Sequence, residues 1–117
     1  MRVLLADDEP KVRSALRLIL EQLKEVDLVE EVTDAESLAN QLRTTPPDLL
    51  LVDWELPGLH RGGTLAEMRR NQSLKVIVLS GRCQTPQSVL ASGMDAFVSK
   101  CEPPDRLFAT LKAMGAD

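Results

Sequence analysis

Short apolar runs alternate along the chain with longer segments that have the periodicity of a helix. The runs are strand-length and rich in Leu, Val and Ile, and they cover residues 2–6, 28–32, 48–53, 75–80 and 96–99. The helical segments cover residues 11–23, a stretch after Thr33 to about residue 44, and residues 64–70, 86–92 and 104–114. This alternation predicts an α/β fold, with a five-stranded parallel sheet and helices on both faces.

Local signals place the centre of the sheet and two helix starts. Residues 48–53 contain Leu-Leu-Leu-Val without an intervening polar residue, which is typical of a parallel strand buried on both faces. Pro10 stands where the missing N–H of a first helical residue costs least. Thr33 and Glu36 have the spacing of a capping box, in which Thr33 accepts a hydrogen bond from the Glu36 N–H.

Size and charge limit the class of protein. A chain of 117 residues can form one domain with its own core but not two of ordinary size, so we expect one domain over residues 1–117. A formal net charge of −4 would repel a nucleic-acid backbone. The apolar runs are far shorter than a membrane span, and no export signal is visible. We therefore expect a cytoplasmic domain that by itself binds neither nucleic acid nor membranes.

Polar residues stand where the predicted strands end. Asp7 and Asp8 follow the first strand, Asp53 ends the third, Ser80 ends the fourth and Lys100 follows the fifth. The carboxyl ends of parallel strands meet at one edge of the sheet, which is where open α/β sheets bind ligands. We therefore expect these five residues to converge in one site.

The predicted site holds three carboxylates, which repel one another unless a cation lies between them. Oxygen ligands favour a hard divalent ion, and Mg²⁺ typically keeps waters that phosphate oxygens can replace. Two charges from the ion and one from Lys100 would balance Asp7, Asp8 and Asp53. Because an aspartate carboxylate can attack phosphorus, Asp53 on the central strand is the candidate for an aspartyl phosphate.

Four motifs in order resemble the response-regulator receiver family of two-component signalling systems. They are Leu-Leu-Ala-Asp-Asp-Glu-Pro, Leu-Val-Asp-Trp-Glu-Leu-Pro-Gly, Val-Leu-Ser-Gly and Ala-Phe-Val-Ser-Lys. The likeness spans essentially the whole chain and implies a flavodoxin-like (βα)5 fold of strand order 2-1-3-4-5. It also implies that Asp53 is the phosphoacceptor and that Asp8 and Asp53 are direct Mg²⁺ ligands. Asp7 would act mainly through water, and the backbone carbonyl of Glu55 would be a third protein ligand.

The same resemblance implies a switch. Lys100 would pair with the phosphoryl group, the Ser80 hydroxyl would follow it, and Phe97 matches the aromatic switch position. Their movement would alter the face made by helix four, strand five and helix five. The donor would be a sensor histidine kinase. The domain would catalyse its own phosphorylation and slow dephosphorylation without being a dedicated enzyme.

The chain departs from the family pattern after the fifth strand and in one loop. Cys101 follows Lys100 where the family often has proline, and the Lys-x-x-Pro-Pro pattern resembles receivers that precede a LuxR-type helix-turn-helix domain. This favours a transcription regulator whose C-terminal DNA-binding domain is absent from this chain. Residues 59–63 are unlike the usual compact loop, and His60 is expected to be a solvated residue of that loop.

Two pairs of residues near the predicted site carry separate hypotheses. Glu55 and Arg82 would pair across the site mouth and hinder attacking water, or else be two solvated charges. Cys83 and Cys101 are expected to be reduced thiols, with a cross-link between two loops under oxidation as the alternative.

Two other functions remain open. One is a pseudo-receiver that acts as a dimerisation or docking module without phosphoryl chemistry, although the complete acidic set argues against it. The other is a phosphatase or phosphotransferase with an aspartyl intermediate, which would need a cap domain for its substrate. A homodimer through the first or last helices is also left open.

Overall fold

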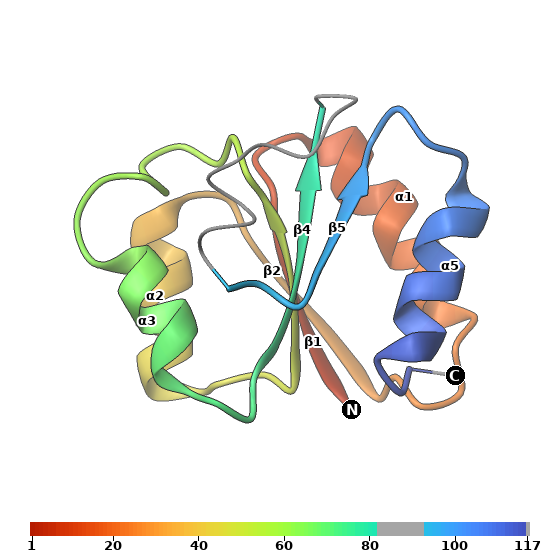
Figure 1. Ribbon diagram of the computed structural model, residues 1–117, viewed down its shortest axis with the longest axis horizontal. Coiled ribbons are helices and arrows are strands. Elements are labelled where there is room, and N and C mark those ends of the chain that lie inside the picture. The colour runs from red at the N-terminus through yellow and green to blue at the C-terminus, as the bar shows by residue number, and fades with distance from the viewer. Residues whose placement is uncertain (82–92, 117) are drawn as a thin grey trace.

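The fold is a five-stranded parallel sheet with helices packed on both faces (Figure 1). The structure is a computed structural model that describes residues 1–81 and 93–116. The elements are β1 (Arg2–Ala6), α1 (Pro10–Glu21), β2 (Leu28–Val32), α2 (Ala35–Thr44), β3 (Leu49–Asp53), α3 (Thr64–Arg70), β4 (Lys75–Ser80), β5 (Ala96–Ser99) and α5 (Pro104–Ala113). The strands lie in the order β2-β1-β3-β4-β5. The predicted flavodoxin-like sheet of order 2-1-3-4-5 is therefore confirmed.

Element boundaries differ from the predicted ones by at most two residues. β3 begins at Leu49 rather than at residue 48, and the Asp48 side chain there accepts a hydrogen bond from the Arg2 N–H at 2.7 Å. α1 ends at Glu21 rather than at residue 23, and α5 ends at Ala113 rather than at residue 114. The helix predicted over residues 86–92 lies outside the described residues.

The start of α2 corrects the predicted capping box. The N-cap is Asp34, whose carboxylate accepts from the Ser37 N–H at 2.7 Å. This hydrogen bond holds the pKa of Asp34 below its ordinary value. The predicted capping box of Thr33 and Glu36 was wrong, because the N-cap lies one residue later than predicted. Asp34 caps the helix by accepting from the N–H of Ser37, three residues further along the chain.

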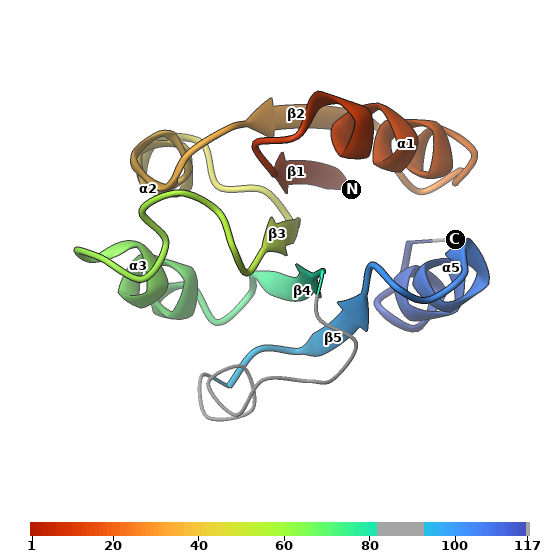
Figure 2. The ribbon, with the colours of Figure 1, turned by 90° about the horizontal axis from the view of Figure 1, so that it is seen from above.

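The sheet separates two apolar cores. α1 and α5 cover one face, and α2 and α3 cover the other (Figure 2). Every residue of β3 is buried, so its side chains fill both cores alternately. Leu50 and Val52 point to the α2 and α3 side, whereas Leu49 and Leu51 point to the α1 and α5 side. A strand buried on both faces can expose polar groups only at its ends.

The edge strand β2 is covered by ion pairs. Glu31 accepts from Arg13 at 2.8 Å and from Arg17 at 2.6 Å, which ties α1 to this strand. Hydrogen bonds from Arg17 and then Arg13 lower the pKa of Glu31, although partial burial opposes the shift. Glu30 pairs with Arg2 of the neighbouring strand at 2.8 Å.

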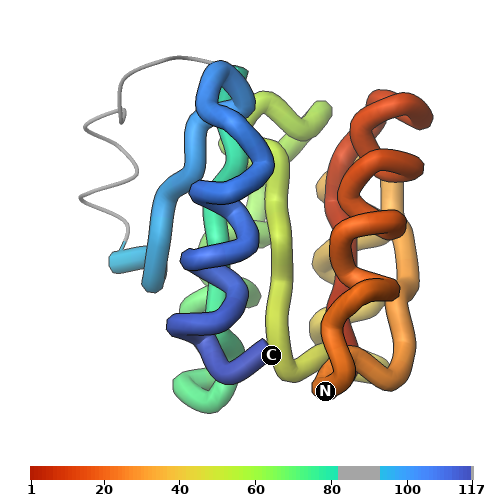
Figure 3. The backbone as a smooth tube through the Cα atoms, turned by 90° about the vertical axis from the view of Figure 1, so that its right-hand side faces the viewer, coloured from red at the N-terminus to blue at the C-terminus, as the bar shows by residue number. Residues whose placement is uncertain are grey.

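Both ends of the described chain lie at the amino edge of the sheet (Figure 3). The Lys75 ammonium at the start of β4 lies 3.3 Å from the Met114 carbonyl oxygen, which fixes the last turn of the chain there. Among the described helices, none combines the length and the apolar character needed to cross a membrane.

Leu50→Ala should lower the free energy of unfolding by about 2–5 kcal/mol, because a fully buried leucine leaves a cavity between the sheet and its helices. Urea denaturation monitored by circular dichroism measures this loss. Leu18→Ala is the matched control, since Leu18 on α1 is 64% exposed and its removal should change stability by less than about 0.5 kcal/mol. Equal losses in the two variants would contradict the assignment of the core.

Candidate functional site

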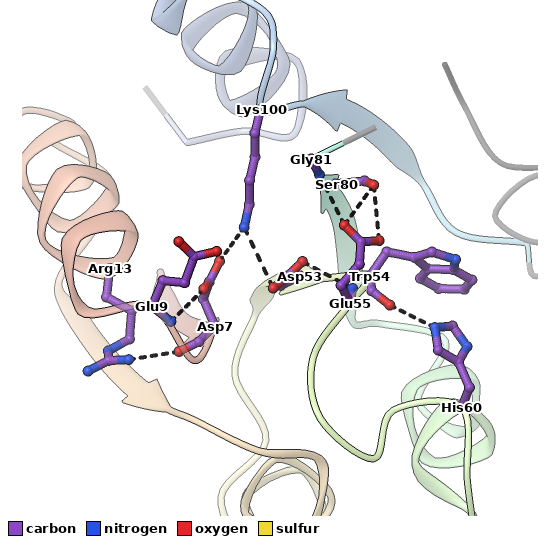
Figure 4. A network of polar contacts seen from close by, with 10 residues as sticks. All are labelled: Asp7, Glu9, Arg13, Asp53, Trp54, Glu55, His60, Ser80, Gly81 and Lys100. Carbon is purple, nitrogen blue, oxygen red and sulfur yellow. Dashed lines mark hydrogen bonds and ion pairs between the residues drawn. The ribbon is translucent and has the colours of Figure 1, made fainter. Parts of the chain in front are cut away.

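Four strands deliver polar residues to the carboxyl edge of the sheet (Figure 4). Asp7 follows β1, Asp53 is the last residue of β3, Ser80 is the last residue of β4, and Lys100 follows β5. Backbone hydrogen bonds continue past the strand ends, from Trp54 N to Leu79 O at 2.7 Å and from Lys100 N to Ser80 O at 2.7 Å. The backbone pairing between neighbouring strands therefore continues into the site.

The Lys100 ammonium lies between two buried carboxylates. Its Nζ is 2.8 Å from Asp7 Oδ2 and 3.6 Å from Asp53 Oδ2. Only 1% of Asp7 and 3% of Asp53 is exposed. Backbone amides hold the other oxygens, since the Glu9 N–H donates to Asp7 Oδ1 at 2.9 Å and the Glu55 N–H donates to Asp53 Oδ1 at 3.0 Å.

These contacts shift the pKa of two groups. Burial raises the pKa of Asp53, and the Glu55 N–H and the Lys100 charge offset this shift only in part. Burial alone would lower the pKa of Lys100. The hydrogen bond that Lys100 donates to Asp7 and the negative charges of Asp53, Asp7 and Glu9 together outweigh burial, so the pKa of Lys100 is raised. The site therefore holds a fixed positive charge beside an aspartate that is costly to ionise.

Four carboxylates form one acidic cluster at this edge. Ligand atoms of Asp7, Asp8, Glu9 and Asp53 lie within 4.8 Å of one another, and Asp8 and Glu9 are exposed to solvent. Glu9 was missed as a candidate, although Asp7-Asp8-Glu9 is an unbroken acidic run in the sequence. The cluster offers only oxygen ligands, which suits a hard divalent cation.

The Glu55 side chain reaches from the end of β3 to the end of β4. The Ser80 hydroxyl lies 3.0 Å from each Glu55 carboxylate oxygen, and the Gly81 N–H donates to Glu55 Oε1 at 3.0 Å. Ser80 itself is fully buried. Arg82 lies outside the described residues, so its predicted pairing with Glu55 stays a prediction.

His60 contacts the residue that follows Asp53. Its Nε2 lies 2.7 Å from the Trp54 carbonyl oxygen, and since a carbonyl only accepts, Nε2 carries the proton. The two rings meet edge to face with centroids 4.7 Å apart. His60 is exposed in its loop, as predicted, and its contacts with Trp54 are an addition that the sequence did not indicate. Trp54 is 5% exposed and belongs to the core on the α2 and α3 side.

Two residues of the β5 region complete the site's surroundings. Phe97 lies beside Val78 on β4 and is half-buried against the core on the α2 and α3 side. Cys101 is disulfide-bonded, so the expectation of a reduced thiol was wrong at this position. Its Sγ lies 3.3 Å from the Gly81 carbonyl oxygen. Cys83, with which a cross-link was the alternative, lies outside the described residues.

Comparison with known sequences places this geometry in a family. A family model of the response regulator receiver domain matches residues 3–112. The Fimbriae Z protein of Escherichia coli K12 is 30% identical over 109 residues, which cover 91% of this chain and 52% of that protein. The phosphate regulon transcriptional regulatory protein PhoB of the same strain is 31% identical over 118 residues, which cover 97% and 51%. The chain thus spans about half the length of these relatives.

Solved structures agree with the sequence comparison. The isolated REC domain of RcsB from Salmonella enterica serovar Typhimurium, with the phosphomimetic BeF3-, has a TM-score of 0.86 at 31% identity, covering 98% of this chain and 88% of that one. A LuxR-family two-component response regulator from Aurantimonas sp. SI85-9A1 has a TM-score of 0.80 at 27% identity, covering 97% and 83%. With its acidic cluster around Asp53, the chain belongs to the response regulator receiver domain family of two-component systems.

Proposed function

We propose that the domain is a phosphorylation-controlled switch that accepts a phosphoryl group from a sensor histidine kinase onto Asp53. The observation that carries this proposal is the environment of the Asp53 carboxylate. One oxygen is fixed by the Glu55 N–H, and the other faces the Lys100 ammonium and the acidic cluster. A nucleophile held in this way is positioned before the donor arrives.

In the transfer, an Asp53 carboxylate oxygen forms a bond to phosphorus as the N–P bond of a phosphohistidine breaks. The imidazole nitrogen keeps the electron pair of that bond and takes a proton from solvent. Lys100 offsets the negative charge that the phosphoryl oxygens bring to the site. The later attack of water on the aspartyl phosphate would give slow self-catalysed dephosphorylation. This chemistry makes the domain a reactant in signalling rather than a dedicated enzyme.

The acidic cluster fits the Mg²⁺ that this chemistry requires. Asp8 and Asp53 would hold the ion directly, with the Glu55 backbone carbonyl as the third protein ligand. Both Asp7 oxygens already have donors, Lys100 and the Glu9 N–H, which supports an indirect role for Asp7 through water. Exposed Glu9 lies close enough to add a further oxygen. When bound, Mg²⁺ supplies charge neutralisation for the phosphoryl oxygens.

Ser80 and Phe97 would convert phosphorylation into a change of surface. Their strands β4 and β5 are neighbours, and Phe97 is half-buried rather than locked in the core. Movement of the Ser80 hydroxyl toward a phosphoryl group would allow the Phe97 ring to turn inward. The binding face would then change around β5 and α5. The helix expected over residues 86–92, which would share this face, lies outside the described residues.

The output we propose is transcriptional control through a DNA-binding domain outside this chain. RcsB from Salmonella enterica serovar Typhimurium is described as bound to promoter rprA, and PhoB is named a transcriptional regulatory protein. The domain's own charge of −4 does not favour contact with DNA. A homodimer of receiver domains is part of the same proposal, because pairing two receivers would hold two such DNA-binding domains together.

Incubation with acetyl phosphate and Mg²⁺ should add one phosphoryl group to the wild-type domain, measured by intact mass. Asp53→Asn should remain unmodified because it lacks the nucleophile. Lys100→Ala should be modified at least roughly 10²-fold more slowly, because a positioned charge on the transferring group is lost. Lys112→Ala, at the exposed end of α5, is the control for removing a lysine and should react like the wild type. A folded wild-type domain that takes up no phosphoryl group would favour the docking module instead.

Asp53→Asn should raise the melting temperature in Mg²⁺-free buffer at neutral pH. Because the folded state raises the pKa of Asp53, it favours the neutral side chain, and ionisation of Asp53 destabilises it. If removing this charge raises the free energy of unfolding by about 1 kcal/mol, the melting temperature should rise by roughly 4 °C in a domain of this size. Differential scanning calorimetry from pH 7 downward tests the sign, since the variant's advantage should vanish as Asp53 itself becomes protonated.

The same measurement with Mg²⁺ separates the metal site from general charge effects. Added Mg²⁺ should stabilise the wild type clearly and the Asp53→Asn variant much less, because the ion loses a direct ligand. Equal stabilisation of the two proteins by Mg²⁺ would count against a metal site at Asp53.

A further inference from the structure

The Glu55 carboxylate occupies an anion-binding position at the end of β4. It takes the Ser80 hydroxyl on both oxygens and the Gly81 N–H on Oε1, all at 3.0 Å (Figure 4). A hydroxyl and a backbone N–H that converge on one negatively charged group form charge-assisted hydrogen bonds. These two donors can bind any small oxyanion whose oxygens come within hydrogen-bond distance. In this structure the bound anion is a side chain of the domain itself.

The same donors lie beside the phosphoacceptor. β3 and β4 pair with Asp53 opposite Leu79, so Ser80 and Gly81 are the next residues along the neighbouring strand. The Asp53 carboxylate is bonded to the Glu55 N–H at 3.0 Å, which places the backbone of Glu55 between the two positions. A phosphoryl group on Asp53 would bring three acceptor oxygens into reach of Ser80.

The two anions cannot share these donors. A phosphoryl group carries about −1.5 to −2 charges at neutral pH, and it would lie next to the negative charge of Glu55. Glu55 is exposed, so its side chain can turn into water without opening the core. The exchange therefore needs only a rotation of one side chain while the Glu55 backbone stays bonded to Asp53.

We propose that Glu55 is an internal competitor of the phosphoryl group, a latch that holds Ser80 and Gly81 in the unphosphorylated arrangement. Phosphorylation of Asp53 releases the latch by taking over its donors. Displacing Glu55 costs part of the free energy that the phosphoryl group gains by binding Ser80 and Gly81, so only the remainder can drive the switch. This inference rests on the proposed phosphorylation of Asp53.

The test uses beryllofluoride with saturating Mg²⁺ as a reversible phosphoryl substitute. Its apparent dissociation constant is measured by ¹⁵N NMR for the wild type and for Glu55→Ala, Glu55→Gln and Glu55→Asp. Each protein is first checked for its fold by circular dichroism. All samples are kept in one oxidation state, because disulfide-bonded Cys101 contacts the Gly81 carbonyl. Glu21→Gln, an exposed glutamate at the end of α1, is the control for loss of one negative charge.

Glu55→Ala should bind beryllofluoride roughly tenfold more tightly, because the binding-competent arrangement no longer has to be freed from a competitor. Glu55→Asp separates occupancy from charge, since it keeps the charge but is one methylene too short to reach both donors. It should resemble Glu55→Ala if the latch acts by occupancy. The Gly81 amide signal should differ between the unliganded wild type and Glu55→Ala, and the two signals should converge when beryllofluoride is bound.

Three results would overturn the latch while leaving the proposed function intact. An unchanged Gly81 amide signal in unliganded Glu55→Ala would show that Glu55 does not contact Gly81 in solution. Equal or weaker beryllofluoride binding by that variant would show that Glu55 does not compete with the phosphoryl group. Wild-type affinity for beryllofluoride in Glu55→Asp would show that only the negative charge of residue 55 affects binding, and not its occupancy of the donors. Failure of the proposed function is recognised separately, because the wild type itself would then bind no beryllofluoride and take up no phosphoryl group by intact mass. That result would overturn the latch as well.

Discussion

The ammonium group of Lys100 between two buried carboxylates is the interaction on which this edge of the sheet depends. β1 and β3 are adjacent parallel strands in register, with Ala6 opposite Val52, so their ends bring Asp7 and Asp53 together. Two carboxylates buried side by side would repel each other strongly. Lys100 comes from β5, beyond β4, and its long side chain crosses the strand ends to reach both. The sheet order is thereby linked to the charge balance of the site.

The segment from Asp53 to Glu55 concentrates several contacts in three residues. The Asp53 carboxylate accepts from the Glu55 N–H, the Glu55 side chain bonds to the end of β4, and the Trp54 carbonyl accepts from His60. The Asp53 carboxylate is therefore connected through a few contacts both to β4 and to the loop that leads to α3.

The sheet could be predicted from the sequence because short strand-length runs alternate with helical segments, and the central strand β3 is an apolar run that ends in Asp53. Asp53 and Lys100 stood out for the same reason, since charged residues that close such runs need a common polar site. Side-chain directions were not predictable in the same way. The spacing of Thr33 and Glu36 suited a capping box, but Asp34 competed one residue later and provided the cap.

Contacts between distant loops were also beyond the sequence pattern. His60 stands alone in a glycine-containing loop, and only the folded chain shows that its ring reaches the Trp54 carbonyl. Glu55 was recognised as a neighbour of the site, but its bonds to Ser80 and Gly81 depend on the pairing of β3 with β4.

The ion pairs on β2 have a consequence for self-association. β2 is the outermost strand on its side of the sheet, and an unpaired strand edge invites another chain to add a strand. An incoming strand would have to lie beside Glu30 and Glu31 and disturb their pairs with Arg2, Arg13 and Arg17. The charges that fasten α1 to the sheet thus also make this edge less favourable for the addition of a further strand.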